Sequence, residues 1–171
     1  MLVTERQIQA EEIQALAEKY EKNRASLMPI LQAIQAKYNH ISDFAMQEIA
    51  RHLDIHPVEV YGIVTFYAFL QTKKTGKFVI RLCRTLSCDM AGKSRVARQL
   101  ESELGIAFGE TTPDGHFTLE YANCIGLCDQ GPSMLVNDVA FTMVTPERVH
   151  EIIRGCKRTF SVYAQEVTKH A

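Results

Sequence analysis

Apolar residues recur every three or four positions through the first seventy residues, which is the spacing of one face of an α-helix. The positions that follow this period are Ile8, Glu12, Leu16, Tyr20, Leu27, Leu31, Ile34, Tyr38, Ile49 and Leu53. The repeat is broken at Asn39-His40, where Ser42 or Asp43 can cap the next helix, and before Pro57, which suits a first helical turn. We therefore predict a bundle of three or four short helices.

The pattern changes at residues 71–77, QTKKTGK, a polar stretch with a glycine that is typical of a domain boundary. Beyond it, the chain reads strand, helix, strand, strand, strand, helix. These runs are residues 78–82, 90–105, 116–122, 133–136, 139–144 and 145 onwards. We predict two domains in an α+β arrangement, an N-terminal helical bundle at residues 1–75 and a small α/β domain at residues 76–171.

The same patterns predict which side chains face the core of the second domain. They are Val96, Leu100, Leu104, Phe117, Leu119, Tyr121, Val149, Ile152, Ile153 and Cys156. Cys156 is thereby interpreted as a small buried hydrophobe rather than a reactive thiol. Asn137-Asp138, between the third and fourth strands, favours a tight hairpin.

Composition excludes several classes of protein. The chain has 171 residues, 46% of them hydrophobic, which indicates a globular protein. Its 19 Lys and Arg against 20 Asp and Glu give a net charge of -1, so a nucleic-acid partner is not expected. No segment reaches the roughly 18 to 20 apolar residues of a membrane span, and the first residues lack the apolar core of a signal peptide. We expect a soluble cytoplasmic protein.

Cysteines carry the candidate chemistry. The chain has five, an odd number, and in a reducing compartment this favours metal or redox chemistry over a disulfide framework. Four of them form two close pairs, in CRTLSC at residues 83–88 and CIGLC at residues 124–128. A tetrahedral metal about 2.3 Å from sulfur needs two thiolates about 3.7 Å apart, and a short loop can provide such a pair. The fold must then bring the two pairs together.

Three kinds of site are compatible with paired cysteines. A thioredoxin-type dithiol requires CxxC, which is absent from this chain. A structural zinc site more often has two residues inside each pair. A 2Fe-2S cluster takes four thiolates and tolerates a pair with four residues inside it. The spacing favours iron-sulfur over zinc and leaves both open.

Other features near the cysteines have simpler interpretations. Gly92-Lys93-Ser94 imitates the end of a phosphate-binding loop, but Ser87 stands where that loop needs glycine, and we expect the motif inside a helix. Cys88 is expected directly before that helix, near Asp89, where the positive helix end would favour a thiolate. Five cations could add positive charge to the site or form a solvated helix face. They are Arg81, Arg84, Lys93, Arg95 and Arg98.

These motifs resemble a known family over about residues 25–157. The resemblance rests on both cysteine pairs, on EVYGIVTFYAF, and on GETTPDGHFTLEYANCIGLCDQGPSMLVND around the second pair. The chain is similar to the thioredoxin-like 2Fe-2S subunit of respiratory complex I and of NAD-linked hydrogenases and formate dehydrogenases. The resemblance implies a helical bundle followed by a thioredoxin-like ferredoxin domain, with one 2Fe-2S cluster held by Cys83, Cys88, Cys124 and Cys128.

The resemblance also implies partners. Such a protein exchanges electrons with a flavoprotein that holds FMN and NAD(P), and it works beside a larger iron-sulfur or hydrogenase subunit. It is an accessory electron-transfer subunit of an NAD(P)-linked oxidoreductase, with no substrate site of its own. CRTLSCDMAGK departs from the respiratory pattern, which has Gly-Thr before the second cysteine and His soon after it. This difference favours a hydrogenase, electron-bifurcating ones included. Formate dehydrogenase and complex I are the alternatives, and a zinc-stabilised interaction module is the alternative of another class.

The segment VYGIVTFYAFL, residues 60–70, has more bulky apolar side chains than a helix with one water-facing side needs. We expect the helical part to dock on the flavoprotein, with Tyr61, Phe66, Tyr67 and Phe69 as anchors. The alternative is that all four rings fill the core of the bundle.

Overall fold

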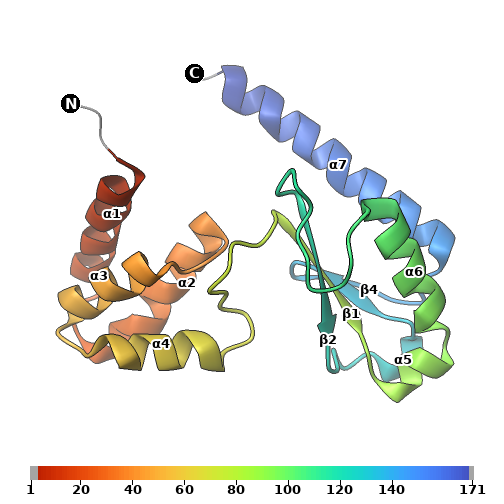
Figure 1. Ribbon diagram of the computed structural model, residues 1–171, viewed down its shortest axis with the longest axis horizontal. Helices are drawn as coiled ribbons and strands as arrows, with labels where there is room; N and C mark the ends of the chain where they lie inside the picture. The colour runs from red at the N-terminus through yellow and green to blue at the C-terminus, as the bar shows by residue number, and fades with distance from the viewer. Residues whose placement is uncertain (1–3, 170–171) are drawn as a thin grey trace. The chain divides into compact units, whose positions relative to one another are not determined.

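The computed structural model describes residues 4–169, and the side chains up to residue 159. The chain divides into two compact units, Met1–Thr75 and Gly76–Ala171 (Figure 1). Each unit has its own hydrophobic core. Among the described residues, no helix is long and apolar enough to cross a membrane.

The N-terminal unit is helical, as predicted. Its elements are α1 (Glu5–Lys19), the short 3-10 helix η1 (Arg24–Ser26), α2 (Leu27–Tyr38), α3 (Asp43–Leu53) and α4 (Pro57–Phe66). The Ser42 hydroxyl caps α3 by accepting the Ala45 N–H at 3.1 Å. Asn39 and Asp54 end α2 and α3 in the left-handed region, at φ 58° and 53°. The breaks between helices therefore lie where the polar residues interrupt the repeat.

The buried stripe of α1 lies one residue away from the predicted one. Gln9, Ile13 and Ala17 are buried, whereas Ile8 is 44% exposed. Both stripes have a spacing of four residues, so periodicity alone does not choose between them. Glu12 instead faces α2, where it pairs with the Lys37 ammonium.

The C-terminal unit is a mixed four-stranded sheet with helices. Its elements are β1 (Phe78–Cys83), α5 (Leu86–Met90), α6 (Lys93–Leu104), β2 (Phe117–Ala122), the 3-10 helix η2 (Cys128–Gln130), β3 (Met134–Val136), β4 (Val139–Phe141) and α7 (Pro146–Lys169). The strand order is β2-β1-β3-β4, with β1 and β2 parallel and the other two pairs antiparallel. Apart from the short α5 and η2, this is the predicted order of elements.

One face of the sheet packs on α6 and α7 (Figure 1). Ile80, Leu119 and Met134 supply this face, and Leu100 and Val149 pack against it from the two helices; all five are fully buried. Because β1 and β2 are parallel, the chain must cross over between them, and α6 makes that crossover.

Tyr121 is an exception to the predicted core. It is 43% exposed and stacks on the Phe108 ring, with the ring centroids 3.9 Å apart. Thr118 is buried instead, because its hydroxyl accepts the Gly76 N–H at 2.6 Å. The core side of β2 therefore ends at Leu119, and the rest of the strand leads towards the second cysteine pair.

Candidate iron-sulfur site

The parallel pairing of β1 and β2 brings the two cysteine pairs to one edge of the sheet. Cys83 is the last residue of β1 and is in register with Ala122, the last residue of β2. Cys124 follows Ala122 by two residues. The carboxyl ends of neighbouring parallel strands lie at the same edge, and the Cys83 Sγ is 3.6 Å from the carbonyl oxygen of Asn123, the residue before Cys124.

The first pair is buried. Cys83 is 1% exposed and Cys88 is not exposed. Cys88 lies inside α5, so its predicted position directly before a longer helix is wrong. The reason is Gly92, whose φ of +99° ends the segment that contains Cys88 and starts α6 at Lys93.

The second pair lies at the surface, with Cys124 in the loop after β2 and Cys128 at the start of η2. Cys124 and Cys128 are both exposed, and their Sγ atoms are 3.6 Å apart. The Gly126 N–H donates to the Cys124 Sγ at 3.4 Å, with Gly126 at φ +82°. The Sγ separation matches the roughly 3.7 Å expected for two thiolates on one tetrahedral metal.

The four sulfurs share one electrostatic environment. Burial opposes ionisation of Cys83, but hydrogen bonds from Thr85 and from the Cys88 thiol outweigh it and lower the pKa of the Cys83 thiol to about 7. The pKa of Cys128 is raised by its hydrogen bond with Cys124 and by the negative charge on that thiol, with smaller contributions from Cys83 and Cys88. Thiolates that share such an environment repel one another, and bound cations would relieve that repulsion.

Two hydroxyls contact the buried pair. The Thr85 Oγ1 lies 3.2 Å from the Cys83 Sγ, and the Ser133 Oγ lies 3.4 Å from the Cys88 Sγ. Sequence reasoning missed Ser133. The signal that could have revealed it is strand pairing. Leu82 pairs with Met134 in the antiparallel pair of β1 and β3, so Ser133, the residue before Met134, lies opposite Cys83.

The donor set fits a two-iron cluster. The two pairs supply four thiolates, which is the usual ligand set of a 2Fe-2S cluster. Among the side chains that the structure describes, no three His, Cys, Asp or Glu residues come together closely enough to hold a single ion. The cysteines are thus seen as two pairs near one edge of the sheet.

The cations near the site are mostly paired with neighbours. Arg81 forms an ion pair with Glu120 at 3.0 Å, and Lys93 forms one with Asp89 at 3.1 Å. The Arg84 Nε donates to the Asn123 Oδ1 at 2.9 Å, which ties the end of β1 to the residue before Cys124. Arg84 therefore contributes to the position of the second pair as well as to local charge.

The phosphate-loop resemblance needs one correction. Gly92 is the N-cap of α6, so Gly92-Lys93-Ser94 opens that helix and does not lie inside it. Ser87 still stands where the loop requires glycine. Lys93 is held by Asp89, so the motif remains a helix start and not a nucleotide site.

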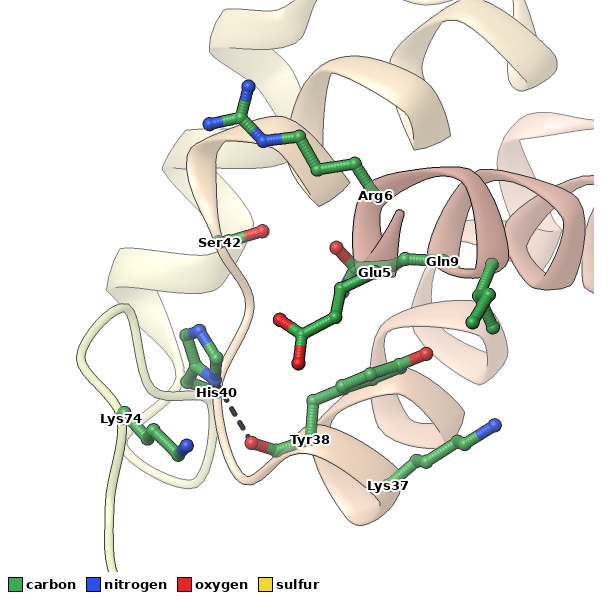
Figure 2. Close-up of a pocket in the computed structure, with 9 residues that line it drawn as sticks. Glu5, Arg6, Gln9, Lys37, Tyr38, His40, Ser42 and Lys74 are labelled. Atoms are coloured by element: carbon green, nitrogen blue, oxygen red, sulfur yellow. Dashed lines mark hydrogen bonds between the residues drawn. The ribbon is translucent and has the colours of Figure 1, made fainter. Parts of the chain in front are cut away.

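A cavity of about 420 Å³ in the N-terminal unit is unrelated to the cysteines. Figure 2 shows the Glu5 carboxylate pointing into it, near His40, whose Nδ1 is 3.0 Å from the Tyr38 carbonyl oxygen. Lys37 extends away from the cavity and pairs with Glu12. The cavity is lined by mixed charges and no thiol, so it has no ligands for an iron-sulfur cluster.

The thioredoxin-like order of elements and the two cysteine pairs define a small electron-transfer protein of the ferredoxin type. The chain matches the family of thioredoxin-like 2Fe-2S ferredoxins over residues 13–157. It belongs to this family, and its cofactor is a 2Fe-2S cluster. The expected fold and cofactor are thereby confirmed.

Several relatives are subunits of NAD-linked oxidoreductases. A subunit of the NADH-quinone oxidoreductase of Rhizobium meliloti (strain 1021) is 40% identical over 128 residues, covering 75% of this chain and 76% of the relative. A subunit of the NADH-quinone oxidoreductase of Thermus thermophilus is 37% identical over 138 residues, covering 80% and 76%. The alpha subunit of the NAD-reducing hydrogenase HoxS of Cupriavidus necator is 37% identical over 146 residues, covering 85% of this chain and only 24% of that subunit.

The fold is also similar to a solved structure of an NAD+-reducing NiFe-hydrogenase in its H2-reduced state. The TM-score is 0.66 at 23% sequence identity, over 75% of this chain and 22% of that one. This likeness concerns the fold.

Proposed function

We propose that this chain is the 2Fe-2S electron-transfer subunit of a multisubunit NAD(P)-linked oxidoreductase, with Cys83, Cys88, Cys124 and Cys128 as the cluster ligands. The observation that carries the proposal is the parallel pairing of β1 and β2, which leaves the Cys83 Sγ 3.6 Å from the carbonyl oxygen of Asn123, the residue before Cys124. In the second pair, the Cys124 and Cys128 Sγ atoms are 3.6 Å apart. Relatives in two kinds of NAD-linked complex support the electron-transfer role.

The bound cluster would accept and release one electron at a time, whereas nicotinamide chemistry moves two. We therefore expect the flavin that splits the pair, and the NAD(P) site, on a partner flavoprotein. The hydrogenase relative supports this arrangement. The segment that matches this chain is only 24% of that subunit, so other sites of the hydrogenase subunit lie outside the matching segment. Leu86 and Met90 flank Cys88 on α5 and are 74% and 83% exposed, a small apolar surface that a partner could cover.

The ligand assignment is tested by metal and sulfide analysis of anaerobically prepared protein. Two irons and two inorganic sulfides per chain are expected. Replacement of Cys124 or Cys128 by Ala should abolish the cluster, while Cys156→Ala leaves it intact. Stoichiometric zinc without visible absorption would instead establish the zinc-stabilised interaction module.

Within the class of NAD(P)-linked complexes we place hydrogenase first, an electron-bifurcating enzyme included. The supporting feature is the first pair, where Leu86-Ser87 precedes Cys88 in place of the Gly-Thr of respiratory members. The test is co-purification of the native assembly followed by assay with hydrogen and with formate. NAD(P)+ reduction by formate would indicate a formate dehydrogenase, and quinone reduction would indicate complex I.

We further propose that α4 and the residues after it dock on the flavoprotein. Tyr61, Phe66, Tyr67 and Phe69 are 56%, 78%, 38% and 46% exposed, so these rings do not fill the core of the bundle. Phe66 and Tyr67 meet edge to face at 5.0 Å between centroids, and Tyr67 and Phe69 are 5.4 Å apart. We call these four side chains the α4 aromatic surface. Exposed aromatic side chains, three of them in mutual contact, are typical of protein interfaces.

A further inference from the structure

We propose that Ser133 and Thr85 set the reduction potential of the cluster by donating hydrogen bonds to two of its ligand sulfurs. The inference rests on the ligand assignment proposed above. Neither residue would bind metal; each would act through the cysteine that it contacts, as a positioning residue.

Ser133 is held between the two cysteines of the buried pair. Its carbonyl oxygen accepts the Cys83 N–H at 3.1 Å, and its hydroxyl lies 3.4 Å from the Cys88 Sγ. Ser133 is fully buried. A buried hydroxyl without a partner is costly, and Cys88 supplies its partner here.

Cluster binding decides the direction of these hydrogen bonds. A free thiol can donate or accept, but a cysteine bound to iron is a thiolate and can only accept. The Ser133 hydroxyl must then donate to Cys88, and the Thr85 hydroxyl, 3.2 Å from the Cys83 Sγ, must donate to Cys83. Both donors point at the buried pair.

The exposed pair has a different environment. Cys124 receives the Gly126 N–H at 3.4 Å, and Cys124 and Cys128 are both exposed. An added electron makes the four-thiolate site more negative. A fixed hydroxyl donor stabilises that added charge, so Ser133, which is fully buried, and Thr85, which is half-buried, should both raise the reduction potential.

The test is potentiometric titration of the full-length, cluster-loaded protein, followed by visible absorption and electron paramagnetic resonance. Ser133→Ala and Thr85→Val each remove one donor. Each should lower the equilibrium constant for reduction by up to about tenfold, which is about 59 mV for a one-electron couple. Thr85→Ser keeps the hydroxyl and should restore the original potential. Ser133→Thr likewise keeps the hydroxyl. Its potential is measured as well, in case Ser133→Ala does not assemble the cluster.

Thr118→Val is the matched control. Thr118 is also buried, but its hydroxyl contacts the Gly76 N–H and the Thr111 hydroxyl, at 2.6 and 2.8 Å, and no sulfur. This variant should lose stability and keep its potential. Iron and sulfide content is measured for every protein, so that loss of the cluster is separated from a changed potential. Absence of a two-iron cluster from the unchanged protein would contradict the ligand assignment. Ser133→Ala or Thr85→Val with two irons and an unchanged potential would overturn the role proposed for that residue. If Ser133→Ala and Ser133→Thr both lost the cluster while Thr85→Val kept its potential, the whole inference would be wrong.

Discussion

At the scale of single residues, Gly131 illustrates how close packing shapes the site. A Cβ placed on it would lie 3.2 Å from the Ala91 Cβ and 3.5 Å from the Cys88 Sγ. The contact with Cys88 is an ordinary van der Waals distance, but the contact with Ala91 is tight enough that Ala91 must shift by a few tenths of an ångström. The missing side chain of Gly131 therefore leaves room for Ala91, at the end of the short helix that contains Cys88.

We predict that Gly131→Ala pushes on Ala91, shifts the α5 segment that contains Cys88, and lowers the iron and sulfide content of the purified protein, with a loss of about 1 kcal/mol in unfolding free energy. The measurement is metal analysis combined with thermal unfolding. Gly155→Ala in α7 is the control, because nothing lies within 4 Å of its added Cβ and alanine favours a helix. A full cluster in the Gly131→Ala protein at unchanged stability would contradict this explanation.

Glu12 links α1 to α2 in the N-terminal unit. It pairs with the Lys37 ammonium, and its other carboxylate oxygen accepts the Tyr38 hydroxyl at 2.7 Å. These two hydrogen bonds lower the pKa of Glu12 below its ordinary 4.5. Burial raises the pKa of Tyr38 to about 12, and its hydrogen bond to Glu12 adds to this shift.

We predict a matching pH dependence of stability. Because the pKa of Glu12 is lower in the folded state, its contribution is present above pH 4.5 and is lost as the pH falls through the folded value. Glu12→Gln should lower the unfolding free energy by about 1 kcal/mol at neutral pH and flatten the acid limb of a pH–stability curve. Glu11→Gln on the exposed side of α1 is the control. Identical acid limbs in wild type and Glu12→Gln would show that the pair is not important for stability.

At the scale of elements, the order of helices and strands follows from local patterns. The helices of the bundle end or begin at Asn39, Asp54 and Pro57. Asn137, at φ 52°, lies in the turn of the hairpin between β3 and β4. These signals could be recognised in the sequence because each acts through its own backbone conformation. The cysteine pairs were recognisable for a similar reason, since each is a local spacing.

What could not be predicted depends on neighbours distant in sequence. The buried face of α1 is chosen by its packing in the bundle and by the partners of Glu12 on α2. Cys88 was misplaced because the turn at Gly92 is not distinguishable from a continuous helix by periodicity. Ser133 became visible only with the pairing of β1 and β3. Strand pairing and packing are non-local, so one sequence alone carries only a weak signal for them.

The hydrogen bond between Arg84 and Asn123 joins the two segments that carry the cysteine pairs. We predict that Arg84→Ala loosens the exposed loop and speeds loss of iron to a chelator several-fold, because a side-chain hydrogen bond to a charged group contributes about 1.5 kcal/mol or more when intact. Arg98→Ala is the control, since its Nε donates to the Ser94 carbonyl oxygen of its own helix. Equal rates of iron loss in the two variants would show that Arg84 does not hold the exposed cysteine pair in place.

At the scale of the whole molecule, the division into two units separates two tasks. All five cysteines lie in the C-terminal unit, and the N-terminal unit has none. Each unit has a core of its own, so a shortened chain beginning near Lys77 should still assemble the cluster. We propose that the bundle serves through contacts with other proteins. The α4 aromatic surface is the feature that suits such contacts.

The last prediction concerns that surface. Phe66 is 78% exposed, so Phe66→Ser should change the stability of the isolated protein by less than about 0.5 kcal/mol. If Phe66 anchors the flavoprotein, the same change should weaken that complex by about 1 to 2 kcal/mol, a loss of roughly 5- to 30-fold in affinity, because buried aromatics dominate interface energetics.

Binding is measured by titrating the cluster-loaded chain with the purified flavoprotein. Ile8→Ser is the matched control, because Ile8 is an exposed apolar residue of the same unit, at 44%, and lies on α1 instead of α4. The shortened chain should bind more weakly than either full-length variant. If it bound as tightly as the whole protein, or if Phe66→Ser and Ile8→Ser bound equally well, the docking role of the α4 aromatic surface would be wrong, while the ligand assignment in the C-terminal unit would be unaffected.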